Sequence, residues 1–313
     1  MVEYIIKRLL QIPVTLLGLF TLVFLALHVM PGDPVAAYLG DVATPEAITQ
    51  MRTAFGLDKP LYKQYFDTIA GIFSGKLGRS FVSGRDVGKE IRAVFPPTLY
   101  LALAALVLSS TLGVLAGILA AFRLNKLTDY IIMILATLGV SMPVFWVGLL
   151  LIYIFSYKLR LFPVAAVTAP RGFLPQLHAL ILPAISLGLL FTGVVARMTR
   201  STMAEVLNLD FIRTARAKGT TELRIVLAHA LRNALIPIVT VIGINMGLLL
   251  AGTVLVETVF AKPGIGKLLV HSVMAADYPM VQGVILLIGC IYIMANFLVD
   301  LMYVYFDPRI RLS

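Results

Sequence analysis

Charged residues are scarce in this 313-residue chain: they make up 13% of it, where a soluble domain carries about a quarter. Cysteine is nearly absent too, because the chain contains only one. A single cysteine excludes an intrachain disulfide and a zinc site built on cysteines. The shortage of charge, together with an apolar content of 59%, excludes a soluble enzyme and a nucleic-acid binder.

The few charges are unevenly placed, and six charge-free stretches of 22 residues or more lie between them. These stretches cover residues 9–32, 93–122, 130–157, 172–196, 233–256 and 278–299. Each is long enough for one span, because about 20 apolar residues cross the hydrocarbon core as a helix. The sequence therefore predicts an all-α polytopic membrane protein with six transmembrane helices. Pro143 lies inside the third stretch and predicts a kink there.

The positions of the cations predict how the chain is oriented in the membrane. If the N-terminus is inside, the inside segments hold 13 Lys and Arg, and the two short outside loops hold 5. The positive-inside rule then places both termini in the cytoplasm. Residues 33–94 become an extracytoplasmic segment, and Pro96 and Pro97 predict the start of the second helix. Topology thus accounts for the net charge of +10 without a nucleic-acid partner.

Residues 197–236 stand out among the predicted cytoplasmic segments by their length and by carrying 7 cations against 3 acids. Asp210 is suited to cap a helix of about two turns from Phe211 to Lys218, and Gly219 is suited to the left-handed position after it. A helix this short is marginal in water. Two interpretations remain open here. Either a partner protein holds the helix, or the segment packs on the membrane surface and only determines the membrane topology.

The predicted short helix has an apolar side formed by Phe211, Ile212 and Ala215, with basic residues beside it. Thr220 or Thr221 is suited to cap a second helix, which should end before Pro237. The segment is therefore expected to hold two helices before the fifth span begins.

Two stretches of this segment resemble a known family. Residues 213–219 (RTARAKG) and 229–237 (HALRNALIP) are similar to the cytoplasmic EAA loop of ABC-importer permeases, and more narrowly to the B-type subunit of the dipeptide/oligopeptide/nickel permease family. Arg213 stands where that loop usually has Glu, and Arg232 where it usually has its first Pro. The resemblance covers essentially the whole chain, and further matching motifs lie at residues 31–34, 56–61, 277–279 and 307–311.

The resemblance implies a type I ABC importer permease fold. Residues 1–313 would form a single transmembrane permease domain, with 33–94 as an extracytoplasmic insertion and 197–236 as the coupling loop. The ATPase-coupling residues implied are Asp210, Phe211, Arg213, Thr214, Ala215, Arg216, Lys218 and Gly219. The extracytoplasmic insertion either docks a binding protein or plugs the mouth of the pore.

The resemblance also implies an assembly in a bacterial or archaeal cytoplasmic membrane. Its members would be a second related permease, two cytoplasmic ATPase subunits that bind ATP and Mg²⁺, an extracytoplasmic substrate-binding protein and membrane lipid. Di- and oligopeptides are the implied substrates, with nickel, glutathione or another small solute as alternatives.

The sequence predicts no catalytic residue, no metal site and no cofactor in the chain itself. Its nearest approach to a P-loop, at Lys267, has Leu268 where Ser or Thr is needed and Ala261 where the first Gly is needed. A secondary carrier or channel stays open as an alternative of another class. It is disfavoured because His28 and Asp300, the ionisable groups in the spans, lie near their ends.

Four residues are candidates for the translocation pathway or its gate. Met142, Phe145 and Trp146 surround the Pro143 kink, and Asn245 lies in the fifth stretch. The alternative interpretation is that all four only pack helix against helix, because polar and small residues mediate such contacts in lipid.

Overall fold

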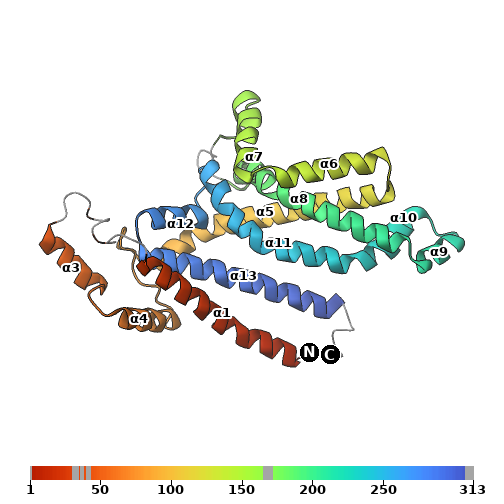
Figure 1. Ribbon diagram of the computed structural model, residues 1–313. Coiled ribbons are helices and arrows are strands. Elements are labelled where there is room, and N and C mark those ends of the chain that lie inside the picture. The colour runs from red at the N-terminus through yellow and green to blue at the C-terminus, as the bar shows by residue number, and fades with distance from the viewer. Residues whose placement is uncertain (1, 30–34, 36–38, 40–43, 165–171, 307–313) are drawn as a thin grey trace. The chain divides into compact units, whose positions relative to one another are not determined.

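The computed structural model describes residues 2–29, 35, 39, 44–164 and 172–306, and of their side chains those from residue 10 to residue 298. Within these ranges every regular element is a helix, and Arg79 and Asp86 form an isolated β-bridge (Figure 1). The motifs at residues 31–34 and 307–311 and the Asp300 side chain lie outside the described part. The chain divides into two compact units. Unit 1 holds residues 99–262 with the end of α13 from residue 294, and unit 2 holds residues 2–98 and 263–293.

Unit 1 is a helix bundle around α8 (Phe173–Leu207), which is the most buried of the long apolar helices. Its other elements are α5 (Val87–Phe122, from Leu99 on), α6 (Leu127–Ser141), α7 (Val144–Leu151), the π-helical segment η2 (Ile152–Lys158), α9 (Asp210–Ala217), α10 (Glu222–Arg224), the π-helical segment η4 (Ile225–Ala230) and α11 (Leu231–Val259). α8 packs against α6, α7 and α11. Leu187 and Phe191 of α8 join Leu249 of α11 in the largest apolar cluster.

Glycines let the helices of unit 1 approach closely. A Cβ atom added at Gly117 of α5 would lie 2.4 Å from the Cβ atom of Thr199 on α8, and one added at Gly193 of α8 would lie 2.3 Å from the carbonyl oxygen of Ala136 on α6. Association of helices in lipid depends on such close packing, because lipid is as apolar as the side chains themselves. The glycines therefore set the spacing of α5, α6 and α8.

Five helices of the described part are long and apolar enough to cross a membrane, and the bent pair Leu127–Ser141 and Val144–Lys158 makes a sixth span if it is counted as one. This result confirms the predicted all-α polytopic membrane fold. The kink predicted at Pro143 is confirmed as well, because the two halves of the pair meet at 104°. Pro143 is the N-cap residue of α7, and the Ser186 hydroxyl donates to the Val144 carbonyl oxygen at 3.0 Å, which fixes the break to α8.

Two predicted helix boundaries are wrong. α5 begins at Val87 instead of Pro96, because the Asp86 side chain accepts a hydrogen bond from the Lys89 amide and Val87 is fully buried in an apolar cluster. The second helix expected before Pro237 does not end there. α10, η4 and α11 follow one another without a break from residue 222 to 259, and Pro237 lies inside α11.

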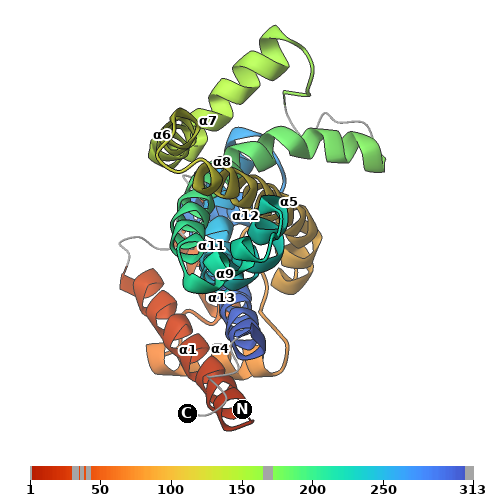
Figure 2. The same ribbon diagram turned by 90° about the vertical axis from the view of Figure 1, so that its right-hand side faces the viewer.

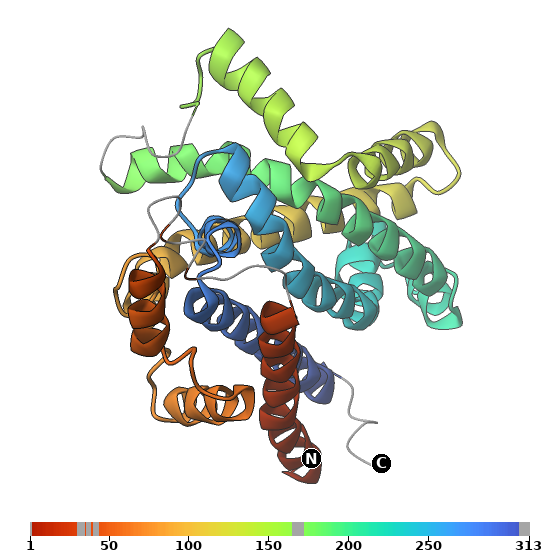
Figure 3. The same ribbon diagram turned by 60° about the vertical axis from the view of Figure 1, so that its left-hand side comes forward.

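Unit 2 joins the predicted extracytoplasmic segment to two long helices. Its elements are α1 (Val2–Val29), α3 (Pro45–Phe55), α4 (Leu61–Phe73), the first part of α5, α12 (Ile265–Met274) and α13 (Tyr278–Phe306, up to residue 293). α1 and α13 lie side by side (Figure 1, and Figure 3 from another direction). The Leu19 side chain of α1 lies against Gly289 of α13. Phe81 of the segment packs in one cluster with Leu27 of α1 and Val281 of α13.

A buried carboxylate ties the segment to α13. Asp277 is 2% exposed, and it accepts hydrogen bonds from the Ser80 hydroxyl and, at 3.0 Å, from the Phe81 amide. The Thr98 hydroxyl of α5 accepts a hydrogen bond from the Ile265 amide at 2.8 Å, which ties the start of α12 to α5. The segment is thus anchored by apolar and polar contacts together.

Candidate functional site

The predicted coupling segment contains one short helix between two long ones. α8 ends at Leu207, α9 occupies Asp210–Ala217, and α10 begins at Glu222. α9 lies at the end of unit 1 that faces the viewer in Figure 2. Asp210 is not the N-cap residue. Leu209 holds that place with extended backbone, and Asp210 is the first helical residue, where a carboxylate still interacts favourably with the helix dipole.

The end of α9 is as predicted. Gly219 has a positive φ of 78°, and its amide donates to the Arg216 carbonyl oxygen at 2.9 Å. The Thr220 amide donates to the Ala215 carbonyl oxygen at 3.2 Å. This left-handed ending is strongly favoured for glycine. It turns the chain back towards Thr221, which precedes α10.

The inner face of α9 packs on the chain's own core. Ile212 is fully buried in a cluster with Met203 and Val206 of α8 and Val226 of η4, and Ala215 packs against the same cluster. Burial of an isoleucine side chain stabilises by about 1.5–3 kcal/mol. This packing holds a helix that would be marginal alone, and it connects α9 to both long helices.

The outer face of α9 is free for a partner. Phe211, predicted to share the apolar side with Ile212, lies at its edge and is 42% exposed. The Arg213 side chain is 72% exposed and bonds to the Asp210 carboxylate at 3.3 Å, while Thr214 and Lys218 are exposed as well. The helix thus presents an aromatic ring among charges.

Arg216 closes the turn after α9. Its guanidinium donates two hydrogen bonds to the Glu222 carboxylate, from Nε at 2.7 Å and from Nη2 at 3.2 Å. Both side chains are nearly half exposed, so the pair adds little stability. The pair bridges the turn that Gly219 makes between α9 and α10, in a bidentate geometry.

The chain matches the sequence models of a known family. The sequence model of the family described as "binding-protein-dependent transport system inner membrane component" matches residues 113–312. The chain belongs to this family of permeases. A second model, for the N-terminal part of such membrane components, matches residues 1–102. Residues 103–112, which neither model matches, lie close to the boundary between the two units after residue 98.

Relatives cover the chain from end to end. It is 43% identical to the di/tripeptide transport system permease protein DppB of Pseudomonas aeruginosa and 40% identical to the dipeptide transport system permease protein DppB of Escherichia coli K12. It is 42% identical to the glutathione transport system permease protein GsiC of Escherichia coli O6:H1. Each alignment covers 99% of both chains. The permease is therefore an ABC permease of the peptide-transport type, with the type I importer fold, and a multi-pass membrane protein.

The pathway candidates of this permease fall on two elements of unit 1. Met142 lies in the break between α6 and α7, and Phe145 and Trp146 lie in the first turn of α7, where both are exposed. Asn245 lies on α11 and is 7% exposed. Its Nδ2 atom has no hydrogen-bond partner within the described residues, an unusual state for a buried amide.

The sequence-based reasoning missed two buried carboxylates of unit 1. Asp129 of α6 is 1% exposed and accepts two hydrogen bonds from Arg200 of α8, at 2.7 and 3.1 Å. Glu257 of α11 is fully buried. Each lies directly beside a charge-free stretch: Asp129 precedes residues 130–157, and Glu257 follows residues 233–256. An acidic residue directly beside a predicted span is itself a signal of a buried pair, because such an acid is costly unless it is paired.

Proposed function

We propose that the permease is a translocation-pore subunit of an ATP-driven importer of di- and oligopeptides in a bacterial or archaeal cytoplasmic membrane. It would work by alternating access with a second related permease, two cytoplasmic ATPase subunits that bind ATP and Mg²⁺, and an extracytoplasmic binding protein. The subunit itself would be non-catalytic. Two of the relatives named above are called permeases of di- or tripeptide transport systems and the third a permease of a glutathione transport system. Glutathione is itself a tripeptide, so the three names share one substrate chemistry.

The observation that carries this proposal is the two-sided packing of α9. Its inner face is fixed to α8 and η4 by Ile212, and its outer face leaves Phe211, Arg213 and Lys218 exposed for an ATPase subunit. A partner that moved α9 would therefore move the ends of two long helices with it. Such coupling requires that α9 bind the two states of the ATPase with different affinity.

Replacing Gly219 with valine should abolish ATP-dependent peptide uptake while leaving membrane insertion intact. Nothing lies within 4 Å of the position, so the cost is only that of forcing a β-branched residue to φ 78°, about 1–2 kcal/mol. Relief of this strain would change the turn that links α9 to α10, so the outer face of α9 would no longer be held in the position from which it contacts the ATPase. The measurement is dipeptide uptake by cells or vesicles, normalised to the amount of permease in the membrane.

Gly75→Val is the matched control for that variant. Gly75 also has a positive φ, of 73°, with nothing within 4 Å, but it lies in unit 2. We expect Gly75→Val to insert and to transport. Normal uptake by Gly219→Val would contradict the coupling role, and equal loss in both variants would show that backbone strain anywhere in the chain suffices.

Asn245 is proposed to face the pathway, and Asn245→Leu tests this. A buried, unpaired amide costs about 1–3 kcal/mol, so a leucine of similar size should preserve or raise the melting temperature. Peptide uptake should nevertheless fall severalfold. Thr199→Val is the control, because Thr199 Oγ1 is the other buried side-chain atom without a partner in the described part of the chain, and it lies against Gly117 instead. Unchanged uptake by Asn245→Leu would assign Asn245 to helix packing.

A further inference from the structure

Unit 2 contains a partly open cavity of about 640 Å³. Small-molecule sites occupy about 300–1,000 Å³, so this volume is sufficient for a ligand of a few residues. Its wall is formed by α3, α4, the loop at residues 76–84 and the adjoining ends of α1 and α13. The coupling and pathway residues of the proposed function all lie in unit 1, so the cavity has no role assigned so far.

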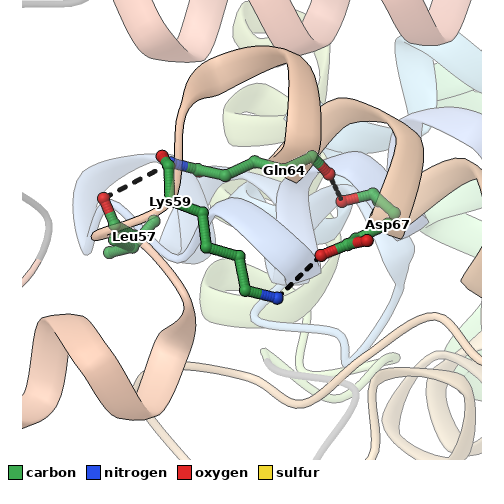
Figure 4. Close-up of polar contacts among 5 residues, drawn as sticks. Leu57, Lys59, Gln64 and Asp67 are labelled. Carbon is green, nitrogen blue, oxygen red and sulfur yellow. Dashed lines mark hydrogen bonds and ion pairs between the residues drawn. The ribbon is translucent and has the colours of Figure 1, made fainter.

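One wall of the cavity is already saturated with hydrogen bonds (Figure 4). The Lys59 ammonium lies 2.7 Å from the Asp67 carboxylate, and this hydrogen bond lowers the pKa of Asp67 below its ordinary value. The Gln64 amide group donates to the carbonyl oxygens of Leu57 and Lys59, at 3.3 and 2.8 Å, and its oxygen meets His28 Nε2 at 3.3 Å. These side chains build the wall and have little capacity left for a ligand.

Three other polar side chains of the lining are unused. Lys76 and Arg79 are exposed, and neither side chain has a hydrogen-bond or ion-pair partner within the described ranges. Gln282 also lines the cavity, and its amide has no partner in that part of the chain. Among the described residues, the lining therefore offers two unpaired positive charges together with one amide that both donates and accepts.

Four aromatic rings also line the cavity. The rings of Phe55 and Phe81 stack with centroids 4.2 Å apart, and Tyr278 lies 6.3 Å from Phe81. Phe24 contributes a further ring. Such a surface accepts an apolar side chain by area burial.

We propose that this cavity binds a small peptide with a free carboxylate: Lys76 and Arg79 hold the carboxylate, Gln282 pairs with a peptide amide, and the aromatic rings cover an apolar side chain. Arg and Lys form charge-assisted hydrogen bonds with carboxylates, and an amide side chain matches the donor and acceptor of a peptide bond. The site would hold substrate at the outer face of the permease. It rests on the proposed function for its choice of substrate.

The test is equilibrium binding of radiolabelled Ala-Phe to the assembled transporter in nanodiscs, without binding protein and without ATP. The variant Lys76→Ala/Arg79→Ala should weaken binding at least tenfold. Lys63→Ala/Arg85→Ala is the matched control: it removes the same charge from exposed positions of the same segment that do not line the cavity, and it should bind as the unaltered protein does. Gln282→Leu should also weaken binding.

Ala-Phe with an amidated C-terminus gives the decisive comparison. It should bind the unaltered protein at least tenfold more weakly than Ala-Phe, and the Lys76→Ala/Arg79→Ala variant should no longer distinguish the two ligands. Absence of saturable binding, equal loss in the control variant, or displacement of Ala-Phe by equimolar inorganic phosphate would overturn the assignment. ATP-dependent uptake of Ala-Phe measured with binding protein tests the proposed function separately, so uptake without cavity binding would refute only the cavity.

Discussion

Gly117→Val should leave little folded permease in the membrane. Gly113 and Gly117 lie four residues apart on the same face of α5, against α8. Even a Cβ atom at Gly117 would lie 2.6 Å from the carbonyl oxygen of Ala196, and backbone cannot yield as a flexible side chain does. Overpacking of this kind costs about 1–3 kcal/mol or more, and the two added methyl groups of valine worsen the clash. The measurement is the yield and melting temperature of monodisperse protein in detergent.

Gly117→Ala and Gly18→Ala separate this clash from helix propensity. Alanine is favoured over glycine inside a helix by about 1 kcal/mol, so propensity alone would stabilise both variants. Gly18 lies in α1 with nothing within 4 Å, and we expect its alanine variant to melt at the same temperature or higher. Gly117→Ala should melt lower. If both variants gained stability, α5 and α8 would not approach as closely as the structure shows.

The spans of this fold were predictable because the bilayer imposes a length that soluble folds do not. Charge-free stretches near 20 residues locate the long helices, and Pro143 marks the break. The start of α5 was not predictable by the same criterion. Residues 87–92 include Lys89, Glu90 and Arg92, so the charge-free stretch begins only after them. What extends the helix is the tertiary burial of Val87 and Ile91 in unit 2.

The coupling helix shows the same division between local and tertiary signals. The Gly219 ending and the approximate limits of α9 follow from residue types adjacent in sequence. The position of Phe211 at the edge of the buried face does not follow from neighbouring residue types, because it depends on where Met203 and Val226 place the core. The Arg216–Glu222 pair forms across the Gly219 turn, and its partners cannot be chosen until that turn is built.

Asp129→Ala should be strongly destabilising, because it leaves Arg200 facing a site built for a carboxylate. The carboxylate holds the Arg200 guanidinium in a bidentate pair and also accepts the Asn125 amide at 3.0 Å, where Asn125 has a positive φ of 59°. The pair thus joins the turn between α5 and α6 to α8. Breaking a buried pair on one side costs about 3–5 kcal/mol, and the 30% exposure of Arg200 lowers that figure.

A double-mutant cycle isolates the pair from the loss of each side chain. Arg200→Leu, Asp129→Leu and the double variant are compared by melting temperature in detergent. Removing both charges leaves no unpaired charge, and the Asn125 amide loses its acceptor in Asp129→Leu and in the double variant alike, so the double variant should be more stable than Asp129→Leu alone. The exposed pair Lys59–Asp67, with side chains 43% and 52% exposed, provides the control cycle, which should be nearly additive.

The same cycle separates stability from transport. Arg200 lies seven residues before the end of α8, one turn before Met203, which packs on α9. If the pair anchors the α8 end that α9 would move, the double variant should recover stability without recovering peptide uptake, because apolar contact replaces the charge pair but not its fixed geometry. Full recovery of both would reduce the pair to a structural contact. Additive losses in the cycle would show that Asp129 and Arg200 do not interact across the two helices at all.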